Sequence, residues 1–318
     1  MIYQNGATIA PGIARLYAGL KHRLAARRVK AAAICAIVIA NVAISTFGAA
    51  AAAAAGACDA GPWTAIETAS VADARTIVLG DGRAVRLAGL ESLAALARDA
   101  KTADAMDALL AGHLAQWLAA KPLAIRVLPG KPDRHGRLAA LLMIGDDLLH
   151  EHLLSAGLAV FMPASFPGDA PGDATGGAAD APGGEAAGDG CARRLLALEA
   201  AARLARRGGW SEPGITVAAA RPDAPSSQFG HFVIFQGIVR SVGTRRERTY
   251  IDFGSQWRND VTVEIAANRR RYFGGEAALE DFAGKSVRVR GFLQEKAGPM
   301  VPVRHPAQIE VLPGTEPR

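Results

Sequence analysis

The sequence lacks acidic residues over its first 57 positions, and it lacks any charged residue between positions 31 and 57. Six of the 36 lysine and arginine residues lie in the first 57 positions, so the remaining 30 balance the 30 acidic residues. The rest of the chain therefore has no net positive charge, which argues against a continuous basic stripe of the kind that dedicated nucleic-acid binders carry. Half of the chain is apolar, enough for one or two hydrophobic cores.

Histidine spacing of the kind that ligates metal ions is also missing. His150 and His152 are two positions apart on a predicted helix, so they face different sides of it. The other histidines in the body of the chain form no ligand motif, and we expect all of these side chains on the surface or in loops. They are His113, His135, His231 and His305.

The uncharged stretch instead has the layout of an export signal. A basic segment ending at Lys30 precedes the apolar run Ala31–Phe47, and small residues then continue to Ala57. The run is long enough for either a cleaved signal peptide or an uncleaved membrane anchor. In both cases the basic flank stays in the cytoplasm, so we expect the rest of the protein in the periplasm or anchored to the inner membrane.

Cysteine is scarce, with three residues in the chain. Cys35 lies in the apolar run, which leaves Cys58 and Cys191 as the exported pair. A pair in an oxidising compartment indicates a disulfide. Two alternatives stay open: Cys58 follows Ala55-Gly56-Ala57, a weak lipoprotein box without its usual leucine, and both thiols may be unpaired.

Apolar periodicity divides the first 150 exported residues into strands and helices. A hairpin is predicted around Gly80-Asp81-Gly82, and an amphipathic helix follows it. The predicted elements, in chain order, are strands Ile66–Leu79 and Ala84–Leu90, helix Ala95–Leu118, strands Leu123–Leu128 and Leu138–Ile144, helix Leu148–Ala156, an extended Leu158–Phe161 and helix Ala192–Arg207.

Two segments have the composition of linkers. Residues 163–190 consist almost wholly of Pro, Gly, Ala and acid, and are predicted to form a disordered acidic insertion. Residues 211–228 are predicted to link a domain at 64–210 to a second domain at 229–312. Five strands are expected in the second domain, namely Phe232–Ser241, Thr249–Phe253, Val261–Ile265, Val287–Leu293 and Met300–Val303, with a helix over Leu279–Phe282.

Three strings in the first domain carry a resemblance. They are DGRAVRL at 81–87, DRHGRLA at 133–139, and LALEAAAR at 196–203 leading to Gly209-Trp210. In this order they resemble the staphylococcal-nuclease-like (thermonuclease) family over about residues 64–210. The resemblance implies a β-barrel with packed helices. It also implies a phosphodiester hydrolase in which two acids hold calcium, a glutamate activates water and two arginines bind phosphate.

The arginine positions of that family fall on Arg86 and Arg137, which can fork onto phosphate oxygens or serve only as structural partners of carboxylates. A metal-binding acid falls on Arg75 and the catalytic glutamate on Ala94, while Glu91 can replace the second acid. Loss of the base and the metal ligand predicts little hydrolysis and no calcium site.

Two arrangements of Arg75 are possible. In one it forms an ion pair with Glu91, and in the other it joins Arg86 and Arg137 as a three-arginine phosphate-binding site for single-stranded nucleic acid or another anionic ligand. Two rival functions stay open. One is an active metal-dependent nuclease that has recruited Asp73 or Asp99, and the other is an envelope scaffold that docks protein or glycan.

The second domain resembles the small oligonucleotide/oligosaccharide-binding (OB) barrels through GIV at 237–239, YIDFG at 250–254, GKSVRVRG at 284–291 and HPAQI at 305–309. Tyr250, Phe253 and Trp257 are candidates for a base-stacking platform, or else for core aromatics. Their basic neighbours are Arg245, Arg246, Arg248 and Arg258.

Overall fold

The computed structural model describes residue 58 and residues 62–119, 122–163, 187–215, 217–219, 228–256 and 258–313, with the backbone alone at 187–189 and 219. The export segment 1–57 with Cys35, residues 164–186 of the acidic insertion, and Trp257 lie outside these ranges. No helix within the described ranges is both long enough and apolar enough to cross a membrane.

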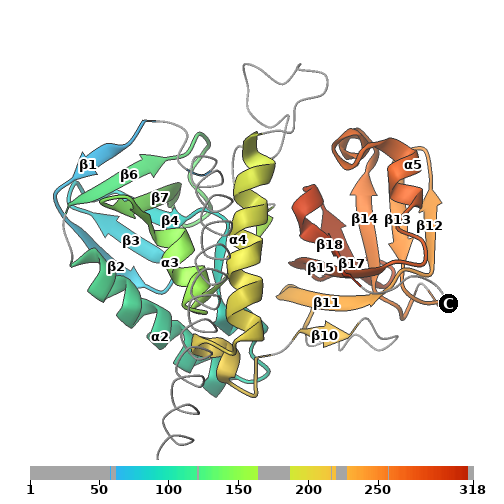
Figure 1. Ribbon diagram of the computed structural model, residues 1–318, viewed down its shortest axis with the longest axis horizontal. Helices are drawn as coiled ribbons and strands as arrows, with labels where there is room; N and C mark the ends of the chain where they lie inside the picture. The colour runs from blue at the N-terminus through green and yellow to red at the C-terminus, as the bar shows by residue number, and fades with distance from the viewer. Residues whose placement is uncertain are drawn as a thin grey trace, which may run out of the picture. The chain divides into compact units, whose positions relative to one another are not determined.

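The first part of the chain forms a curled mixed sheet, a half-barrel with helices packed on it (Figure 1). Its strands run in the order β1-β6-β7-β4-β3-β2, and β8 pairs with β7. The β3 and β4 strands pair antiparallel across the predicted Gly80–Gly82 turn, with Ile77 opposite Val85. The β4 and β7 strands pair in parallel. The bounds are β1 Thr64–Ile66, β2 Ala69–Asp73, β3 Thr76–Leu79, β4 Ala84–Leu87, β6 Leu123–Val127, β7 Leu138–Ile144 and β8 Asp147–Leu148.

The single strand predicted over Ile66–Leu79 is wrong, because the chain makes two breaks there. A tight turn at Ala74-Arg75 separates β2 from β3, and the Asp73 carboxylate stabilises it by accepting a 2.7 Å hydrogen bond from the Arg75 N–H. The turn places Arg75 at the tip of a hairpin.

Three α-helices accompany the sheet: α2 Ala100–Leu118, α3 Leu149–Ser155 and α4 Ala187–Leu204. Asp99 caps α2 by accepting from the Thr102 N–H at 2.8 Å. The α4 helix begins at Ala187, five residues before the predicted start, so Cys191 lies inside the helix and not ahead of it. The core under these helices is fully buried at positions such as Val85, Leu142, Leu149 and Leu195.

A separate ribbon of two short strands lies beside the half-barrel sheet. Strand β5 (Leu90–Ser92) pairs antiparallel with β9 (Ala159–Phe161), so that Glu91 lies opposite Val160. This ribbon is a sheet of its own and shares no strand with the larger sheet. The Ser92 hydroxyl then accepts from the Ala94 N–H and starts the short 3-10 helix η1, Leu93–Leu96.

Two further small sheets follow, of four and five strands (Figure 1). They enclose a second core that includes Val263, Val287, Val289 and Val301, all without exposed surface. The predicted strand Phe232–Ser241 divides into two, β11 and β12. The four-stranded sheet contains β10 Ala218–Ala219, β11 Phe232–Ile238, β15 Ser286–Phe292 and β18 Ile309–Val311; the five-stranded sheet contains β12 Ser241–Thr244, β13 Arg248–Asp252, β14 Thr262–Ala266, β16 Gln294–Glu295 and β17 Pro299–Val303.

Short helices complete this part: η5 Ala267–Phe273, α5 Gly275–Glu280 and η6 Pro306–Gln308. Between the two cores, part of the segment predicted to be a linker is ordered. The 3-10 helix η3 (Gly208–Ser211) leads to Ile215, which is buried, and β10 pairs in parallel with β11. This segment therefore packs against the helices of the first part of the chain and pairs with β11 of the second.

Candidate functional site

Three arginines and one glutamate line a small cavity at the edge of the half-barrel. The cavity has a volume of about 50 Å³. That is room for a few water molecules or one group of similar bulk. The charged lining is Arg75, Arg86, Arg137 and Glu91, and the remaining lining residues are Ala74, Ile77, Leu87, Leu90, Ser92, Leu110, Leu153 and Ala159.

The fold brings these four side chains together from four separate segments. Arg75 lies in the β2–β3 turn, and Arg86 lies on β4. Arg137 directly precedes β7, whose parallel pairing with β4 sets Arg86 beside Ala139. Glu91 comes from the β5–β9 ribbon. The structure therefore assembles all the phosphate-site arginines named from the sequence around one cavity.

Asp133 holds two of the three guanidinium groups. Its Oδ2 accepts from Arg137 Nε at 3.0 Å, lies 2.9 Å from Arg137 Nη2, and lies 3.7 Å from Arg86 Nε. Its Oδ1 accepts from the backbone N–H groups of His135 and Arg137. Although partial burial opposes ionisation, the hydrogen bonds from Arg137 and the backbone lower the pKa of the Asp133 carboxyl to about 2.

Arg137 is anchored at its other end as well. Its Nη1 donates to the Arg75 carbonyl at 3.1 Å and to Thr76 Oγ1 at 3.3 Å. This contact ties the loop before β7 to the β2–β3 turn, so the two arginine-bearing segments are fixed relative to each other. Asp133 was not named as a site residue from the sequence. The sequence feature that could have identified Asp133 is its position four residues before Arg137, across a turn in which Gly136 has φ +76°.

Glu91 lies near the arginines without a direct partner among them. Within the described residues no ion pair joins it to Arg75, so the predicted pairing of these two side chains is wrong; Arg75 is exposed at the hairpin tip. Burial raises the pKa of the Glu91 carboxyl, and the positive charges of Arg75, Arg86 and Arg137 oppose that rise without cancelling it.

The described residues around this cavity do not provide the group of carboxylates that a calcium ion needs. Calcium requires six to eight oxygen ligands, usually with several carboxylates. Among the described residues no group of three or more His, Cys, Asp or Glu side chains is placed to hold a metal ion. Asp73 supports the Arg75 turn, Asp99 caps α2, and Ala94 lies in η1 hydrogen-bonded to Ser92. The exposed cation Arg75 lines the same cavity.

A second, larger cavity of about 400 Å³ adjoins the first and shares Ala74, Arg75 and Arg137 with it. Asp73, Thr76 and Asp107 also contribute to its lining, as do Ala84 and the exposed His135. The two cavities together give the arginine-lined space an open side, where a ligand larger than one anionic group has room to extend.

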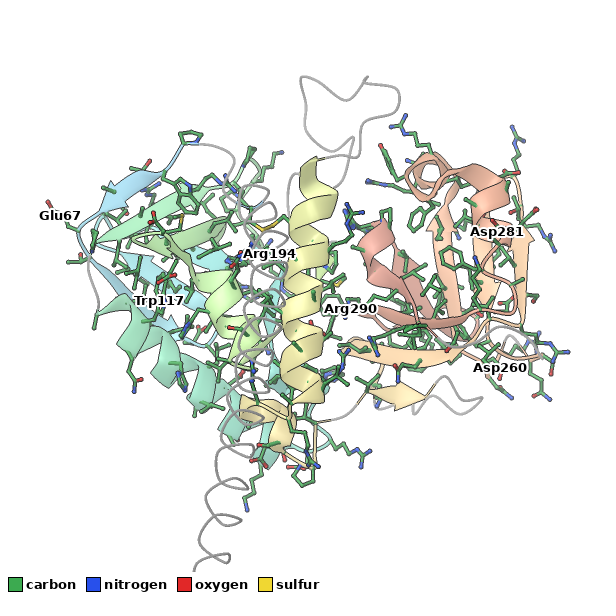
Figure 2. The ribbon with its side chains drawn as sticks, viewed as in Figure 1. Glu67, Trp117, Arg194, Asp260, Asp281 and Arg290 are labelled. Carbon is green, nitrogen blue, oxygen red and sulfur yellow. A yellow bond between two sulfur atoms is a disulfide. The ribbon has the colours of Figure 1, made fainter. Side chains whose placement is uncertain are left out.

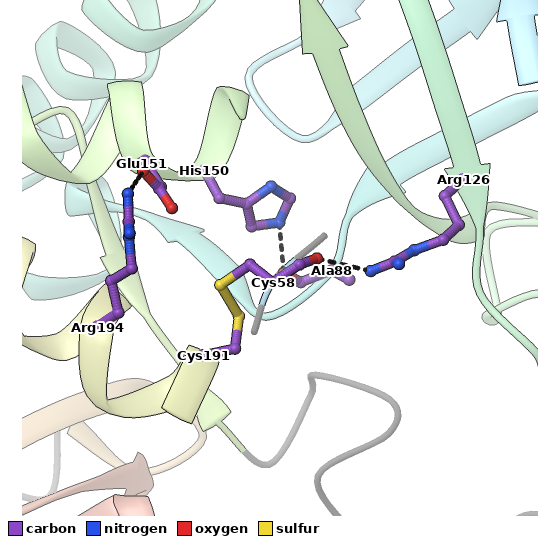
Figure 3. The surroundings of a disulfide bond; sticks show 7 residues. All are labelled: Cys58, Ala88, Arg126, His150, Glu151, Cys191 and Arg194. Atoms are coloured by element: carbon purple, nitrogen blue, oxygen red, sulfur yellow. Dashed lines mark hydrogen bonds and ion pairs between the residues drawn. A yellow bond between two sulfur atoms is a disulfide. The ribbon is translucent and has the colours of Figure 1, made fainter. Parts of the chain in front are cut away.

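A disulfide joins Cys58 to Cys191, with 4.9 Å between the Cα atoms and 133 positions between them in sequence (Figure 3). Both residues are buried, at 2% and 1% exposure. Around the bridge, Arg126 donates to the Cys58 carbonyl at 3.0 Å and Arg194 pairs with Glu151 at 2.6 Å. A sulfur in a disulfide cannot also carry a thioether-linked lipid, so this pairing excludes the lipoprotein alternative in the same molecule.

The expectation that the histidines lie on the surface or in loops is wrong at His150, which is buried on α3. His150 has no exposed surface, and its Nε2 lies 2.8 Å from the Ala88 carbonyl. Burial lowers the pKa of His150 to about 4. His305 is also buried and accepts from the Ala307 N–H. The histidines at 135, 152 and 231 are exposed.

Of the aromatic residues named as a stacking platform or as core residues in the second domain, the structure describes Tyr250 and Phe253. Phe253 packs edge-on against Phe235 with 5.1 Å between the ring centroids, at the margin of the second core. Arg248 forms an ion pair with Glu264 at 3.2 Å. Trp257 is outside the described ranges. Phe253 is therefore a packing residue, in keeping with the core alternative.

No protein-family model matches this chain, and no curated protein matches it either.

Proposed function

We propose that the half-barrel is a degenerate thermonuclease-like domain that binds phosphate groups of single-stranded nucleic acid, or of another anionic ligand, without cleaving them. The observation that carries the proposal is the convergence of Arg75, Arg86 and Arg137 on one small cavity. Guanidinium groups bind phosphate through paired, charge-assisted hydrogen bonds. Three of them outnumber the two nearby carboxyl groups, Glu91 in the cavity lining and Asp133 beside Arg86 and Arg137.

Among the described residues, this cavity lacks two parts of the family's hydrolytic set, the general-base glutamate and the pair of metal-binding acids. A phosphodiester repels an attacking water, and an enzyme overcomes this with a positioned base and a cation. Ala94 provides no base, and among the described residues no group of three or more His, Cys, Asp or Glu side chains is placed to hold a metal ion. Loss of a general base alone costs roughly two to four decades in rate. Binding without turnover is the expected result.

The second domain is proposed to be an OB-like barrel, and the whole protein is proposed to be exported. The buried Cys58–Cys191 disulfide supports export, because such bonds persist in oxidising compartments such as the periplasm. Retention at the inner membrane would depend on whether the segment before residue 58 is cleaved.

The proposal is tested by incubating the full-length protein with labelled single-stranded DNA in calcium and in chelator. We expect intact DNA in both conditions, together with binding that inorganic pyrophosphate displaces. Arg86→Ala and Arg137→Ala should each weaken binding about tenfold. Arg83→Ala is the matched control, since Arg83 is an exposed arginine in the turn between β3 and β4 and is paired with Asp81. Calcium-dependent cleavage would establish the nuclease alternative, and no binding would favour a scaffold.

A further inference from the structure

The β5–β9 ribbon supplies a large part of the anion cavity but has little stability of its own. Leu90, Glu91, Ser92 and Ala159 all line the cavity, and all belong to this ribbon. Each strand has three residues. An isolated pair of strands is marginally stable at best in water, so the ribbon needs support from outside.

The support comes from the C-terminal part of the chain, through a buried arginine. Arg290 on β15 has no exposed surface, and its Nη1 donates to the Phe161 carbonyl at 2.9 Å and to Glu199 at 2.7 Å. Its Nη2 donates to Glu310 at 2.5 Å. Figure 2 labels Arg290 beside α4, the helix that carries Glu199.

Both backbone groups of Phe161 are held by this network. Its carbonyl accepts from Arg290, and its N–H donates to Glu199 Oε2 at 2.8 Å, the oxygen that also accepts from Arg290. Phe161 lies opposite Leu90 in the ribbon, one position from the Glu91–Val160 pair. The Arg290–Glu199 network therefore holds the ribbon at Phe161, whose partner in the ribbon, Leu90, lines the cavity.

Apolar packing reinforces the same connection. Val160 and Met162 of the ribbon segment belong to one buried cluster with Phe232 and Ile234 of β11. Leu93 and Leu96 of η1 complete it on the other side, together with Met106, Ala202, Trp210 and Ile215. Ribbon, α4 and second barrel thus share a core that none of them buries alone.

We propose that the second barrel, formed by strands β10 to β18, is a positioning element of the anion site. It fixes the β5–β9 ribbon through the contact of Arg290 with Glu199 and Phe161 and through the packing of Phe232 and Ile234. The cavity is therefore complete only when both the half-barrel and the second barrel are in place. Arg290 is a positioning residue in this account, because it touches the ribbon backbone and not the cavity. The binding part of the inference rests on the proposed function.

Hydrogen exchange provides a test that is independent of any ligand. In the full-length protein, Arg290→Met removes the donors and leaves Glu199 its ion pair with Arg203. We expect amide exchange across residues 89–92 and 159–162 to accelerate about tenfold or more. The reason is that the loss of one buried charge-assisted hydrogen bond lowers the free energy of local opening enough for a rate change of about this size. The control is Arg271→Met, the same substitution at an exposed arginine of η5 in the same barrel.

Anion binding provides the second arm, with the labelled single-stranded oligonucleotide as probe. Arg290→Met should weaken its affinity several-fold while Arg271→Met leaves it unchanged, with circular dichroism showing both variants folded. If Arg290→Met unfolds the chain, Arg290→Lys serves instead: it keeps the buried charge but reaches fewer of the partners, and should give the same changes at smaller size.

The outcomes separate the two claims. Faster exchange in the ribbon with no oligonucleotide binding even by the wild type supports the positioning role and contradicts the phosphate-binding proposal. Unchanged exchange in residues 159–162 on replacing Arg290 contradicts the positioning role whatever the binding result. Faster exchange with wild-type affinity also overturns the inference, because the ribbon would then move without affecting the site.

Discussion

The Asp133 carboxylate accepts hydrogen bonds from both ends of Arg137, from its backbone N–H at 3.0 Å and from its guanidinium Nε at 3.0 Å. The same carboxylate lies 3.7 Å from Arg86. One acidic side chain thus shapes its own loop and orients two arginines of the proposed site. The negative charge of Asp133 also offsets part of the positive charge of Arg86 and Arg137, which reduces the repulsion between these two arginines.

Asp133→Asn should lower stability at neutral pH by about 1 kcal/mol, because the amide can still accept backbone hydrogen bonds but loses the charge. The folded-state pKa of about 2 is below the ordinary value of 3.8, so the wild-type contribution is present above pH 3.8 and is lost as the pH falls toward 2. Urea unfolding from pH 2 to 5 should therefore show a steeper acid loss for wild type than for the variant. The exposed Asp146 gives the control Asp146→Asn, and parallel curves for wild type and Asp133→Asn would refute the assignment.

His150 should make the protein less stable in mild acid. Its folded pKa of about 4 lies below the unfolded value of 6.5, so the unfolded state binds an extra proton between these pH values. Stability is expected to be complete above pH 6.5 and to fall by about 3 kcal/mol toward pH 4. His150→Asn should flatten this slope in calorimetry or urea unfolding.

The control for that experiment is His152→Asn, on the same helix at an exposed position. It should retain the wild-type slope between pH 4 and 6.5. A wild-type slope in His150→Asn would show that another group titrates in this range.

The disulfide should contribute substantially to stability. Its loop of 133 positions corresponds to about 4 to 5 kcal/mol in the chain-entropy model. The Cys58→Ser/Cys191→Ser variant should therefore unfold at a clearly lower temperature, and reductant should act on the wild type only when denaturant exposes the buried bridge. Intact mass before and after reduction with alkylation should show two cysteines becoming reactive. A lipid mass on Cys58 would contradict the pairing.

Much of the secondary structure could be predicted from the sequence because apolar spacing encodes it. The Gly80–Gly82 hairpin and the helix around Met106–Leu118 follow from alternation and from three- and four-residue steps. The Arg75 turn was missed, because one of its stabilising contacts is a local hydrogen bond from the Arg75 N–H to the Asp73 carboxylate and the other comes from Arg137, 62 positions further along the chain. Its consequence was large, because the turn brings Arg75 to the cavity.

The site itself was only partly predictable. The three arginines were found because their strings resemble a known pattern, and the structure places all three around one cavity. Burial of His150 and the role of Arg290 left no trace in local sequence, because both depend on contacts between segments 62 and 129 positions apart. An arginine in an alternating strand is ordinarily expected at the surface, and here only Glu199 and Glu310 make its burial possible.

The most direct test of the central claim is the salt dependence of oligonucleotide binding by the full-length protein, in calcium and in chelator. Three arginine–phosphate contacts predict a slope of about −2 for log affinity against log salt, at roughly 0.7 per contact on a single strand. The Arg86→Ala/Arg137→Ala variant should reduce that slope by about 1.4, Arg83→Ala should not change it, and the strand should stay intact throughout. An equal slope and affinity in the double variant, or calcium-dependent cleavage by the wild type, would contradict the account.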